Sequence, residues 1–409
     1  MIRLLLYFPI LYITIFFLIL FIENRGTTKE KIDYEEWPSV SIVIPAYNEE
    51  EGIADTIEGA LDLDYPEDKL EVVVVNDGSQ DRTREIAEKY EDEIKLINQE
   101  NQGKGAALNR GLEETSGEFV ACLDADSFPA PGTLKKMLRL MDDDTAAVTP
   151  AMKVNKPDNL LQLMQWFEYI LGIFLKEMME KINCIFVTPG PFSLYRRSVL
   201  EEVGGFDTDS LVEDKEIAHR FQKHHEKIRN CYEGDVYTNA PSTLKEFYHQ
   251  RNRWYKGSLF NAIRYKEMVF HREYGDFGMF QMPVSVIQVF LAAIVLVMIG
   301  KFTLTPIYEL ILNLSAVGFQ VGPLISTMSF DLNILEILLN LNAKNYMVLG
   351  CLGLVTMVLI WISHKITNES IGLKKKMALV PYMFFYFLLI GAVCIVVIWE
   401  VITGKEKKW

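Results

Sequence analysis

The chain has 409 residues, 50% of them hydrophobic and 23% charged, and a formal net charge of −14. This composition excludes a disordered or low-complexity protein, and the length accommodates roughly two to three domain-sized units. From residue 280 onward nine lysines and six acidic residues give a net charge of +3, so the first 279 residues carry −17. Such an acidic region lacks the basic surface that neutralises phosphates, which excludes non-specific nucleic-acid binding.

Residues 4–22 form an uncharged apolar run about long enough to cross a membrane core of ~30 Å as a helix. The alternative is a secretory signal peptide, whose apolar stretch is shorter and ends at small residues, whereas the polar sequence ENR follows here. We therefore expect residues 1–24 to be an uncleaved transmembrane anchor. Three basic residues follow the run and one precedes it, namely Arg25, Lys29, Lys31 and Arg3. This bias predicts a cytoplasmic location for the domain that follows.

Between residues 37 and 278, strand-like and helix-like patterns alternate. Apolar strand signatures occur at Val40–Pro45, Glu71–Val75, Lys95–Ile97 and Phe119–Leu123. Helical patterns lie between them, beginning at Asn48–Glu51 and covering Asp81–Tyr90 and Ala106–Glu114. Continuous Val/Ile runs separated by helices predict a mostly parallel sheet with both faces covered. Ligands of such sheets bind at the carboxyl ends of the strands, where the polar motifs of this chain lie.

The first two strands end in the polar sequences Pro45–Glu50 and Asn76–Ser79. Each one alone is explained by a turn or a helix N-cap, because Asn, Asp, Gly and Ser all serve there. Together, two acidic loops at neighbouring strand ends form a pocket that accepts hydrogen bonds from a nucleobase and a ribose. Residues 103–109, GKGAALN, do not have the Walker A order, but they place two glycines and a lysine at a helix start, which suits a pyrophosphate.

Asp124 and Asp126 flank a small residue directly after an apolar strand. Two carboxylates in this arrangement coordinate a hard divalent ion, with diphosphate oxygens completing its shell. The alternative is a pair of capping aspartates, and the run Asp142–Asp144 is explained in that plainer way as a solvated loop. Asp124 and Asp126 differ from it because they end a buried strand, where an unpaired charge is costly.

Glu213 and Asp214 precede a predicted helix at Lys215–Lys223. They either cap that helix or supply a general base whose pKa is raised by burial and by neighbouring carboxylates. Further on, residues 250–254 read QRNRW, in which an arginine beside a tryptophan suits a leaving diphosphate and a stacked sugar ring. A basic juxtamembrane stretch explains the same residues, and this motif alone does not decide between the two.

Other features favour ordinary structural roles. Residues 159–180 are too polar to span a membrane and predict an amphipathic helix, either packed on the sheet or, as we favour, at the membrane interface. We expect His219, His224 and His225 at the surface. Five scattered cysteines without a CxxC pair predict reduced thiols, with neither a disulfide framework nor a zinc site.

The C-terminal region contains further candidate spans, at about residues 282–300, 346–363 and 378–400. A fourth apolar stretch, residues 305–329, is interrupted by glycines and prolines and fits a span, a re-entrant piece or an outer loop. Lys374–Lys376 indicate a cytoplasmic loop before the last helix, whereas Lys405–Lys408 indicate a cytoplasmic C-terminus. Both clusters cannot be inside if one spanning helix separates them, so the topology stays open.

Taken in order, these motifs resemble those of family 2 inverting glycosyltransferases of the GT-A fold, over about residues 38–260. The Gln-x-x-Arg-Trp element is typical of membrane-embedded, often processive members: poly-N-acetylglucosamine, hyaluronan, chitin and cellulose synthases. The resemblance implies an α/β GT-A domain with a Rossmann-like, mostly parallel sheet at residues 37–278, followed by an α-helical transmembrane region at residues 279–409. The ending Trp399–Trp409 resembles that of bacterial poly-N-acetylglucosamine synthases, which favours a cytoplasmic C-terminus and five spans in all.

The resemblance also implies a role for each motif residue. The nucleotide-sugar donor is expected to contact Ala46, Tyr47, Glu49, Asp77, Lys104 and Asp124. A Mg²⁺ or Mn²⁺ ion is expected at Asp126 and Asp124, and Asp214 is expected to act as general base with support from Glu213. The acceptor and the leaving diphosphate are expected to contact Gln250, Arg253 and Trp254. The segment Thr188–Ser193 takes the place of the acceptor-side loop, and its sequence departs from several synthases.

The implied function is transfer of a sugar, with inversion, from a nucleotide-sugar donor (a UDP-sugar is expected) to a growing polysaccharide or glycolipid at the cell membrane, with possible coupling to export. The alternative is a polyprenyl-phosphate glycosyltransferase that makes a lipid-linked sugar, which generally lacks the element at residues 250–254. A non-catalytic sensor of nucleotide sugars is disfavoured by the intact acidic residues. A transporter is disfavoured because intramembrane polar residues are few.

Overall fold

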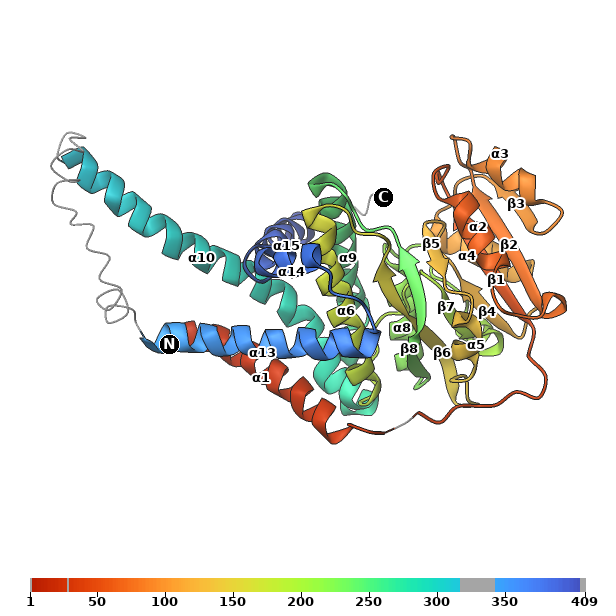
Figure 1. The fold of residues 1–409 in the computed structure, drawn as a ribbon, viewed down its shortest axis with the longest axis horizontal. Coiled ribbons are helices and arrows are strands. Elements are labelled where there is room, and N and C mark those ends of the chain that lie inside the picture. Colours follow the sequence, from red (N-terminus) through yellow and green to blue (C-terminus); the bar gives the residue numbers. More distant parts are fainter. Residues whose placement is uncertain (1, 28, 317–342, 405–409) are drawn as a thin grey trace.

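The computed structural model describes residues 2–27, 29–316 and 343–404. Within these residues, a sheet covered by helices forms one end of the molecule, and long apolar helices extend from the other (Figure 1). The predicted N-terminal helix is present as α1 (Ile2–Glu23). The Lys405–Lys408 cluster and residues 317–329 of the fourth apolar stretch lie outside the described residues.

The described residues form an eight-stranded sheet in the order β3-β2-β1-β4-β7-β6-β8-β5. The strands are β1 (Val40–Ala46), β2 (Leu70–Asp77), β3 (Lys95–Gln99), β4 (Phe119–Cys122), β5 (Ser127–Pro129), β6 (Thr145–Val154), β7 (Ser193–Arg196) and β8 (Lys227–Thr238). The first four strands confirm the predicted ones. β1 lies between β2 and β4 in parallel register, with Val43 opposite Val73 and Cys122, so the carboxyl ends of these strands meet at one edge.

The expectation of a mostly parallel sheet is wrong for its second half. β4–β7, β6–β7 and β5–β8 pair antiparallel, and only β6–β8 is parallel there. The apolar pattern reports burial on both faces of a strand, not the direction of its neighbours. Leu194 and Tyr195 of β7 are 0% and 1% exposed, as completely buried as a residue of a central parallel strand. The sheet is therefore mixed.

Helices cover both faces of the sheet, because successive side chains of β1 point to opposite faces and each face packs against helices. Val43 joins the core cluster that contains Leu108 of α4 (Lys104–Glu113), and Ile44 joins the one that contains Ile57 of α2 (Ile53–Leu61). The predicted helix at residues 81–90 is split into α3 (Thr83–Ala87) and a 3-10 turn. The remaining short helices of this domain are α5 (Thr133–Leu138), α7 (Arg197–Glu202) and α8 (Glu213–Lys223).

Two helices lie between the sheet and the apolar helices, α6 (Leu160–Glu180) and α9 (Leu244–Arg264) (Figure 1). Each begins at a capping box, formed by Asn159 and Thr243, which satisfies the free N–H groups of the first turn. α6 contacts β6 and β8 as well as α13 and α14. The predicted helix at residues 159–180 is thus confirmed and packs on the sheet, while its place at a membrane surface stays a prediction.

The apolar helices of the C-terminal region are α10 (Met282–Ala316), α13 (Ala343–Thr367), α14 (Leu373–Pro381) and α15 (Phe387–Ile402). α10 continues through residues 301–316 as one helix of 35 residues, so the fourth stretch is not separate from the first candidate span up to residue 316. A long apolar helix tolerates the loss of the one backbone hydrogen bond that an interior proline removes. Among the described residues, Phe277–Met298 and Leu373–Ile402 are long and apolar enough to cross a membrane, and Tyr12–Glu23 and Gly353–Thr367 are shorter apolar helices.

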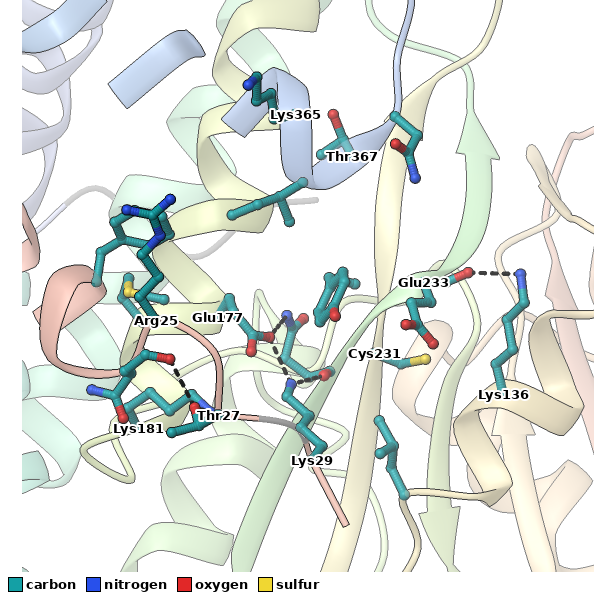
Figure 2. A pocket seen from close by; sticks show the side chains of 18 of the residues that line it. Arg25, Thr27, Lys29, Lys136, Glu177, Lys181, Cys231, Glu233, Lys365 and Thr367 are labelled. Carbon is teal, nitrogen blue, oxygen red and sulfur yellow. Dashed lines mark hydrogen bonds and ion pairs between the residues drawn. The ribbon is translucent and has the colours of Figure 1, made fainter. Parts of the chain in front are cut away.

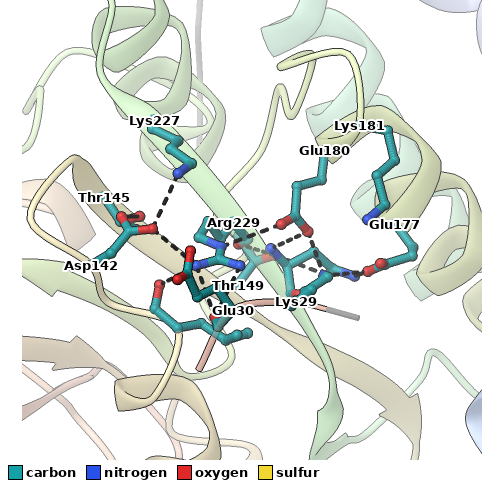
Figure 3. A network of polar contacts seen from close by, with 12 residues as sticks. Lys29, Glu30, Asp142, Thr145, Thr149, Glu177, Glu180, Lys181, Lys227 and Arg229 are labelled. Carbon is teal, nitrogen blue, oxygen red and sulfur yellow. Dashed lines mark hydrogen bonds and ion pairs between the residues drawn. The ribbon is translucent and has the colours of Figure 1, made fainter. Parts of the chain in front are cut away.

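Buried ion pairs fix the linker between α1 and β1 to the sheet domain (Figure 3). The Nζ atom of Lys29 lies 2.6 Å from Glu177 Oε2 and also pairs with Glu180. Arg229 of β8 pairs with Glu180 at 3.5 Å and with Asp142 at 3.1 Å. Asp142, expected in a solvated loop, therefore belongs to this network. Arg229 is 87 positions from Asp142 in the sequence, so the aspartate run alone did not indicate this contact.

Candidate active site

The loops that follow β1 and β2 are joined by hydrogen bonds. The backbone N–H groups of Asn48 and Glu49 donate to Ser79 Oγ at 3.0 Å and to Thr83 Oγ1 at 2.7 Å. Asn48 has a φ of 56°, a left-handed conformation that asparagine tolerates better than most residues. The two polar strand ends, predicted separately, therefore form a single unit.

The predicted donor-side residues Ala46, Tyr47 and Asp77 lie where β1 and β2 end. Ala46 is 1% exposed and Tyr47 is 46% exposed. The carboxylate of Asp77 accepts hydrogen bonds from the Gln99 side chain at 2.7 Å and from the backbone N–H of Gly103 at 2.8 Å. Gly103 has a φ of 90°, which glycine adopts without strain. Asp77 thus holds the loop that leads into α4, a use that its motif did not indicate.

Lys104, the first residue of α4, connects three elements of the site. Its Nζ atom lies 2.6 Å from Asp124 Oδ1, directly after β4, and 2.7 Å from Glu213 Oε1, at the start of α8. Burial opposes the lysine charge, but Asp124 and Glu213 outweigh it and raise the pKa of Lys104 above its usual value. Residues that are 20 and 109 positions from Lys104 in the sequence therefore meet at one charged centre.

Glu213 and Asp214 are neighbours with opposite pKa shifts. Burial raises the pKa of Asp214 to about 6, and the charge of Glu213 adds to this, against the effects of Lys104 and Arg253. Burial also disfavours the charge of Glu213, but its ion pair with Lys104 outweighs that and lowers the Glu213 pKa. One carboxylate is thus firmly ionised, and the other has a pKa close to the neutral range, as a general base requires.

Glu49, Asp124 and Asp126 bring negative charge together beside this centre. Burial raises the pKa of Glu49 to about 7, with Asp126 and Asp124 adding to the effect, and burial and Asp124 raise the pKa of Asp126. A divalent cation relieves such repulsion. No group of three or more His, Cys, Asp or Glu at metal-binding spacing occurs among the described residues. The site thus fits Mg²⁺ or Mn²⁺ held by two carboxylates, with phosphates and water as the other ligands.

The predicted acceptor-side segment lies directly against the charged centre. A Cβ atom at Gly190 would lie 2.5 Å from Asp124 Oδ1 and 2.6 Å from Lys104 Nζ, so a larger residue there would displace these side chains. The side chain and the backbone N–H of Thr188 both donate to the carbonyl oxygen of Asp214, at 2.9 and 3.1 Å. This segment therefore positions the first turn of α8.

Of the predicted residues on α9, Arg253 lies close enough to act on the pKa values of both Glu213 and Asp214. Trp254 and Gln250 each contact Arg251. The Arg251 guanidinium lies over the Trp254 ring, 4.0 Å from its centroid, and donates to Gln250 Oε1 at 2.9 Å.

Arg251 is the most important residue that the sequence reasoning missed. Its side chain is 0% exposed, pairs with Glu168 of α6, and donates to the Tyr386 hydroxyl at 3.2 Å. Tyr386 in turn donates to Glu168 at 2.7 Å. These three residues join α9 to α6 and to the helices after residue 373. No sequence signal predicts the contact, because its members are 83 and 135 positions from Arg251.

The surface location expected for His219 is wrong. The residue is 3% exposed, its ring contacts Phe277, and burial lowers its pKa to about 4. α8 is buried on the face that carries Ile217 and Phe221, and His219 belongs to that interior. His224 and His225 are exposed, as expected. The four cysteine side chains that the structure describes are buried, and their reduced state stays a prediction.

The chain is similar in sequence to known glycosyltransferases. Residues 41–204 match the model of glycosyl transferase family 2. A probable glycosyltransferase YdaM of Bacillus subtilis (strain 168) is 34% identical over 259 residues, 60% of this chain and 61% of that protein. A poly-beta-1,6-N-acetyl-D-glucosamine synthase of Staphylococcus epidermidis is 31% identical over 235 residues, 56% of each chain. The matched part therefore spans about three fifths of the length of these relatives.

The solved structure of the mannosyltransferase PcManGT from Pyrobaculum calidifontis, in complex with GDP-Man and Mn²⁺, has a similar fold. It superimposes with a TM-score of 0.58 and 18% identity over 98% of this chain and 99% of that one. The likeness shows a shared fold, which contains the mixed Rossmann-type sheet described above. In sequence, the match to the glycosyl transferase family 2 model covers residues 41–204, which confirms the resemblance drawn from the motifs.

Proposed function

We propose that this chain is a membrane-bound, inverting glycosyltransferase that transfers a sugar from a UDP-sugar to a growing polysaccharide or glycolipid. The observation that carries the proposal is the convergence of Lys104, Asp124 and the Glu213–Asp214 pair from three separate elements. The polysaccharide class is supported by the relatives named as poly-beta-1,6-N-acetyl-D-glucosamine synthases.

The donor binds at the edge where β1, β2 and β4 end. The exposed ring of Tyr47 offers a face for the nucleobase, and Ala46 and Asp77 shape the nucleoside pocket. Lys104 and Asp124 lie beside the diphosphate. Asp126 and Asp124 would hold the Mg²⁺ or Mn²⁺ ion, which neutralises diphosphate charge when bound. A metal role is supported by the raised pKa of Asp126 and by the Mn²⁺ in the mannosyltransferase complex.

Asp214 takes the proton of the acceptor hydroxyl. The hydroxyl oxygen attacks the anomeric carbon, the bond from that carbon to the diphosphate oxygen breaks, and the configuration inverts. A pKa of about 6 leaves Asp214 ionised at neutral pH and more basic than an ordinary aspartate. Glu213, ionised beside Lys104, keeps the Asp214 pKa raised.

The acceptor end and the leaving group lie along α9. Arg253, within electrostatic reach of Asp214, is placed to stabilise the departing diphosphate. Arg251 stacks on one face of the Trp254 ring, and the other face is offered to the acceptor sugar. Gln250 accepts a hydrogen bond from the same arginine. Positioning and charge neutralisation supply most of the acceleration.

For the membrane, we propose that residues 1–24 anchor the chain, residues 37–278 form the cytoplasmic domain and residues 279–409 form the membrane region of a multi-pass protein. Two long apolar helices and the basic residues after α1 support this arrangement. Both ends of the α14–α15 segment contact the catalytic domain. Near its start, Trp166 donates to Glu369 at 3.2 Å, and near its end, Glu400 lies 3.1 Å from Lys256.

The competing function is a polyprenyl-phosphate glycosyltransferase, and product analysis distinguishes the two. The full chain, purified in detergent and returned to phospholipid vesicles, is supplied with Mg²⁺ or Mn²⁺ and a panel of nucleotide sugars, and release of nucleoside diphosphate is measured. Our proposal predicts UDP release and a radiolabelled product of many sugars. A lipid that carries a single sugar supports the competing function. Donor binding without turnover for any acceptor indicates a non-catalytic sensor.

A further inference from the structure

We infer that a cavity between the ends of α1, α6 and α13 binds the phosphate headgroup of an anionic membrane lipid. The cavity has a volume of about 770 Å³ and is lined by these helix ends and by β8 (Figure 2). No residue of the proposed transfer site lines it. The inference goes beyond sugar transfer, and it rests on the membrane location proposed above.

The charges around the cavity do not balance. Six basic and three acidic side chains line it, in a chain whose net charge is −14. Each of the three carboxylates already has a cation: Glu177 pairs with Lys29, Glu233 with Lys31, and Asp235 with Lys153. An excess of positive charge therefore remains at the cavity.

This excess belongs to Arg25, Lys136, Lys181 and Lys365. None of them forms an ion pair with any residue that the structure describes. Lys181 has only a 3.5 Å contact with Thr27 Oγ1, and Lys365 lies 4.1 Å from the centroid of the Trp361 ring. By contrast, Lys136 donates to the Glu233 carbonyl at 2.9 Å, so the other three are the free cations. The free cations suit a phosphate, which accepts several charge-assisted hydrogen bonds at once.

The three free cations come from three different elements. Arg25 follows α1, Lys181 directly follows α6, and Lys365 is in the last turn of α13. Figure 2 shows Arg25 and Lys181 on the side of α1 and α6, and Lys365 on α13 above them. A ligand bound by all three would connect both apolar helices to the sheet domain.

The surroundings favour a lipid over a soluble phosphate. Phe21, Met178 and Ile366 give the cavity apolar walls. The helices that lead away from it carry large apolar side chains that are 43–64% exposed, namely Ile15, Ile19 and Ile22 of α1 and Leu354, Met357 and Val358 of α13. A lipid places its phosphate among the cations and its acyl chains along this surface. Clustered Lys and Arg at the cytoplasmic end of membrane helices attract anionic lipids for the same reason.

Lipid binding by the full chain tests the inference. The protein, purified in a neutral detergent, is titrated with dioctanoyl phosphatidylglycerol, dioctanoyl phosphatidylcholine and inorganic phosphate, and bound lipid is counted by native mass spectrometry. The triple variant Arg25→Gln, Lys181→Gln, Lys365→Gln removes the free cations. The matched control removes three exposed cations elsewhere, Lys89→Gln, Lys156→Gln and Arg272→Gln.

We expect selective binding of phosphatidylglycerol over phosphatidylcholine, and a loss of roughly 100-fold in the triple variant but not in the control. Equal binding of phosphatidylglycerol by both variants overturns the inference. Displacement of the lipid by inorganic phosphate at equal concentration assigns the cavity to a soluble phosphate and contradicts the lipid. The single variant Lys365→Gln, whose side chain is exposed, provides the same comparison with less risk to folding. Because the readout is bound lipid and not sugar transfer, its failure is distinguishable from failure of the proposed function.

Discussion

The donor side and the acceptor side of the site are held in place by different kinds of contact. On the donor side, loops at the ends of parallel strands hydrogen-bond to one another, as Asn48 does to Ser79. On the acceptor side, buried charges join α9 to helices outside the sheet, through Arg251–Glu168 and Lys256–Glu400. The donor side is thus fixed by the sheet domain itself. The acceptor side depends on how the C-terminal helices pack, and Lys104 with Glu213 joins the two.

The largest expected effect is loss of the proton acceptor at the junction of the two sides. Asp214→Asn keeps the shape of the side chain and removes its basicity. We expect sugar transfer to fall by roughly 10³-fold, since general-base catalysis contributes about 10²- to 10⁴-fold, while donor affinity stays within twofold or so. Nucleoside diphosphate release measures the first quantity and titration calorimetry with the donor measures the second. Asp143→Asn, an exposed residue, is the matched control. Loss of donor binding in Asp214→Asn contradicts the assigned role.

A smaller loss is expected where the acceptor-side segment touches the donor side. Gly190→Ala forces a Cβ against Asp124 and Lys104 and displaces both. A misplacement of about 1 Å costs on the order of 100-fold in rate, so we expect kcat to fall by about that factor. Gly132→Ala, whose Cβ meets only the flexible end of Lys136 at 3.8 Å, is expected to behave as wild type. Equal activity of the two variants would contradict the close contact of Gly190 with Asp124 and Lys104.

A substitution of Arg251 tests most directly whether the donor side and the acceptor side are held in place independently. Arg251→Gln leaves Glu168 without its cation and Trp254 without its stacked partner. We expect the acceptor KM to rise roughly tenfold and the thermal stability to fall, because breaking a buried ion pair costs about 3 kcal/mol, whereas the donor affinity is unchanged. The exposed Arg272→Gln is the control. A change in donor affinity equal to that in acceptor KM shows that the two sides are not held independently.

The smallest effect is a shift in the pH profile. With Asp214 as the proposed base, transfer requires its ionised form, so the rate is expected to fall as the pH drops through its pKa of about 6. The positive charge of Lys104 lowers that pKa. Lys104→Gln removes the charge, so the acid midpoint of the residual activity is expected to move to higher pH. Rates between pH 4.5 and 8, a range of roughly two units on each side of the midpoint, measure this. A midpoint that stays in place or moves to lower pH contradicts the assignment of Asp214 as base.

The difference between the two sides also explains which features could be predicted from the sequence. The strands β1, β2 and β4 and the polar residues at their ends were predictable, because continuous apolar runs and the turn residues after them are local signals. The antiparallel β7 and the contact of Arg251 with Glu168 and Tyr386 were not, because strand direction and long-range partners leave no local pattern. His219 shows the same limit: its burial follows from what packs on α8. The strands and loops around β1, β2 and β4 were therefore predicted better than the contacts of α8 and α9.

The central claim is that the two sides meet at the ion pair between Lys104 and Glu213. A double-mutant cycle of transfer rates, with Lys104→Met, Glu213→Gln and the combined variant, tests it most directly. Because the two side chains lie 2.7 Å apart, the account predicts that the second substitution costs little once the first is made, with a coupling of at least roughly tenfold in rate. Losses that simply multiply would contradict the account.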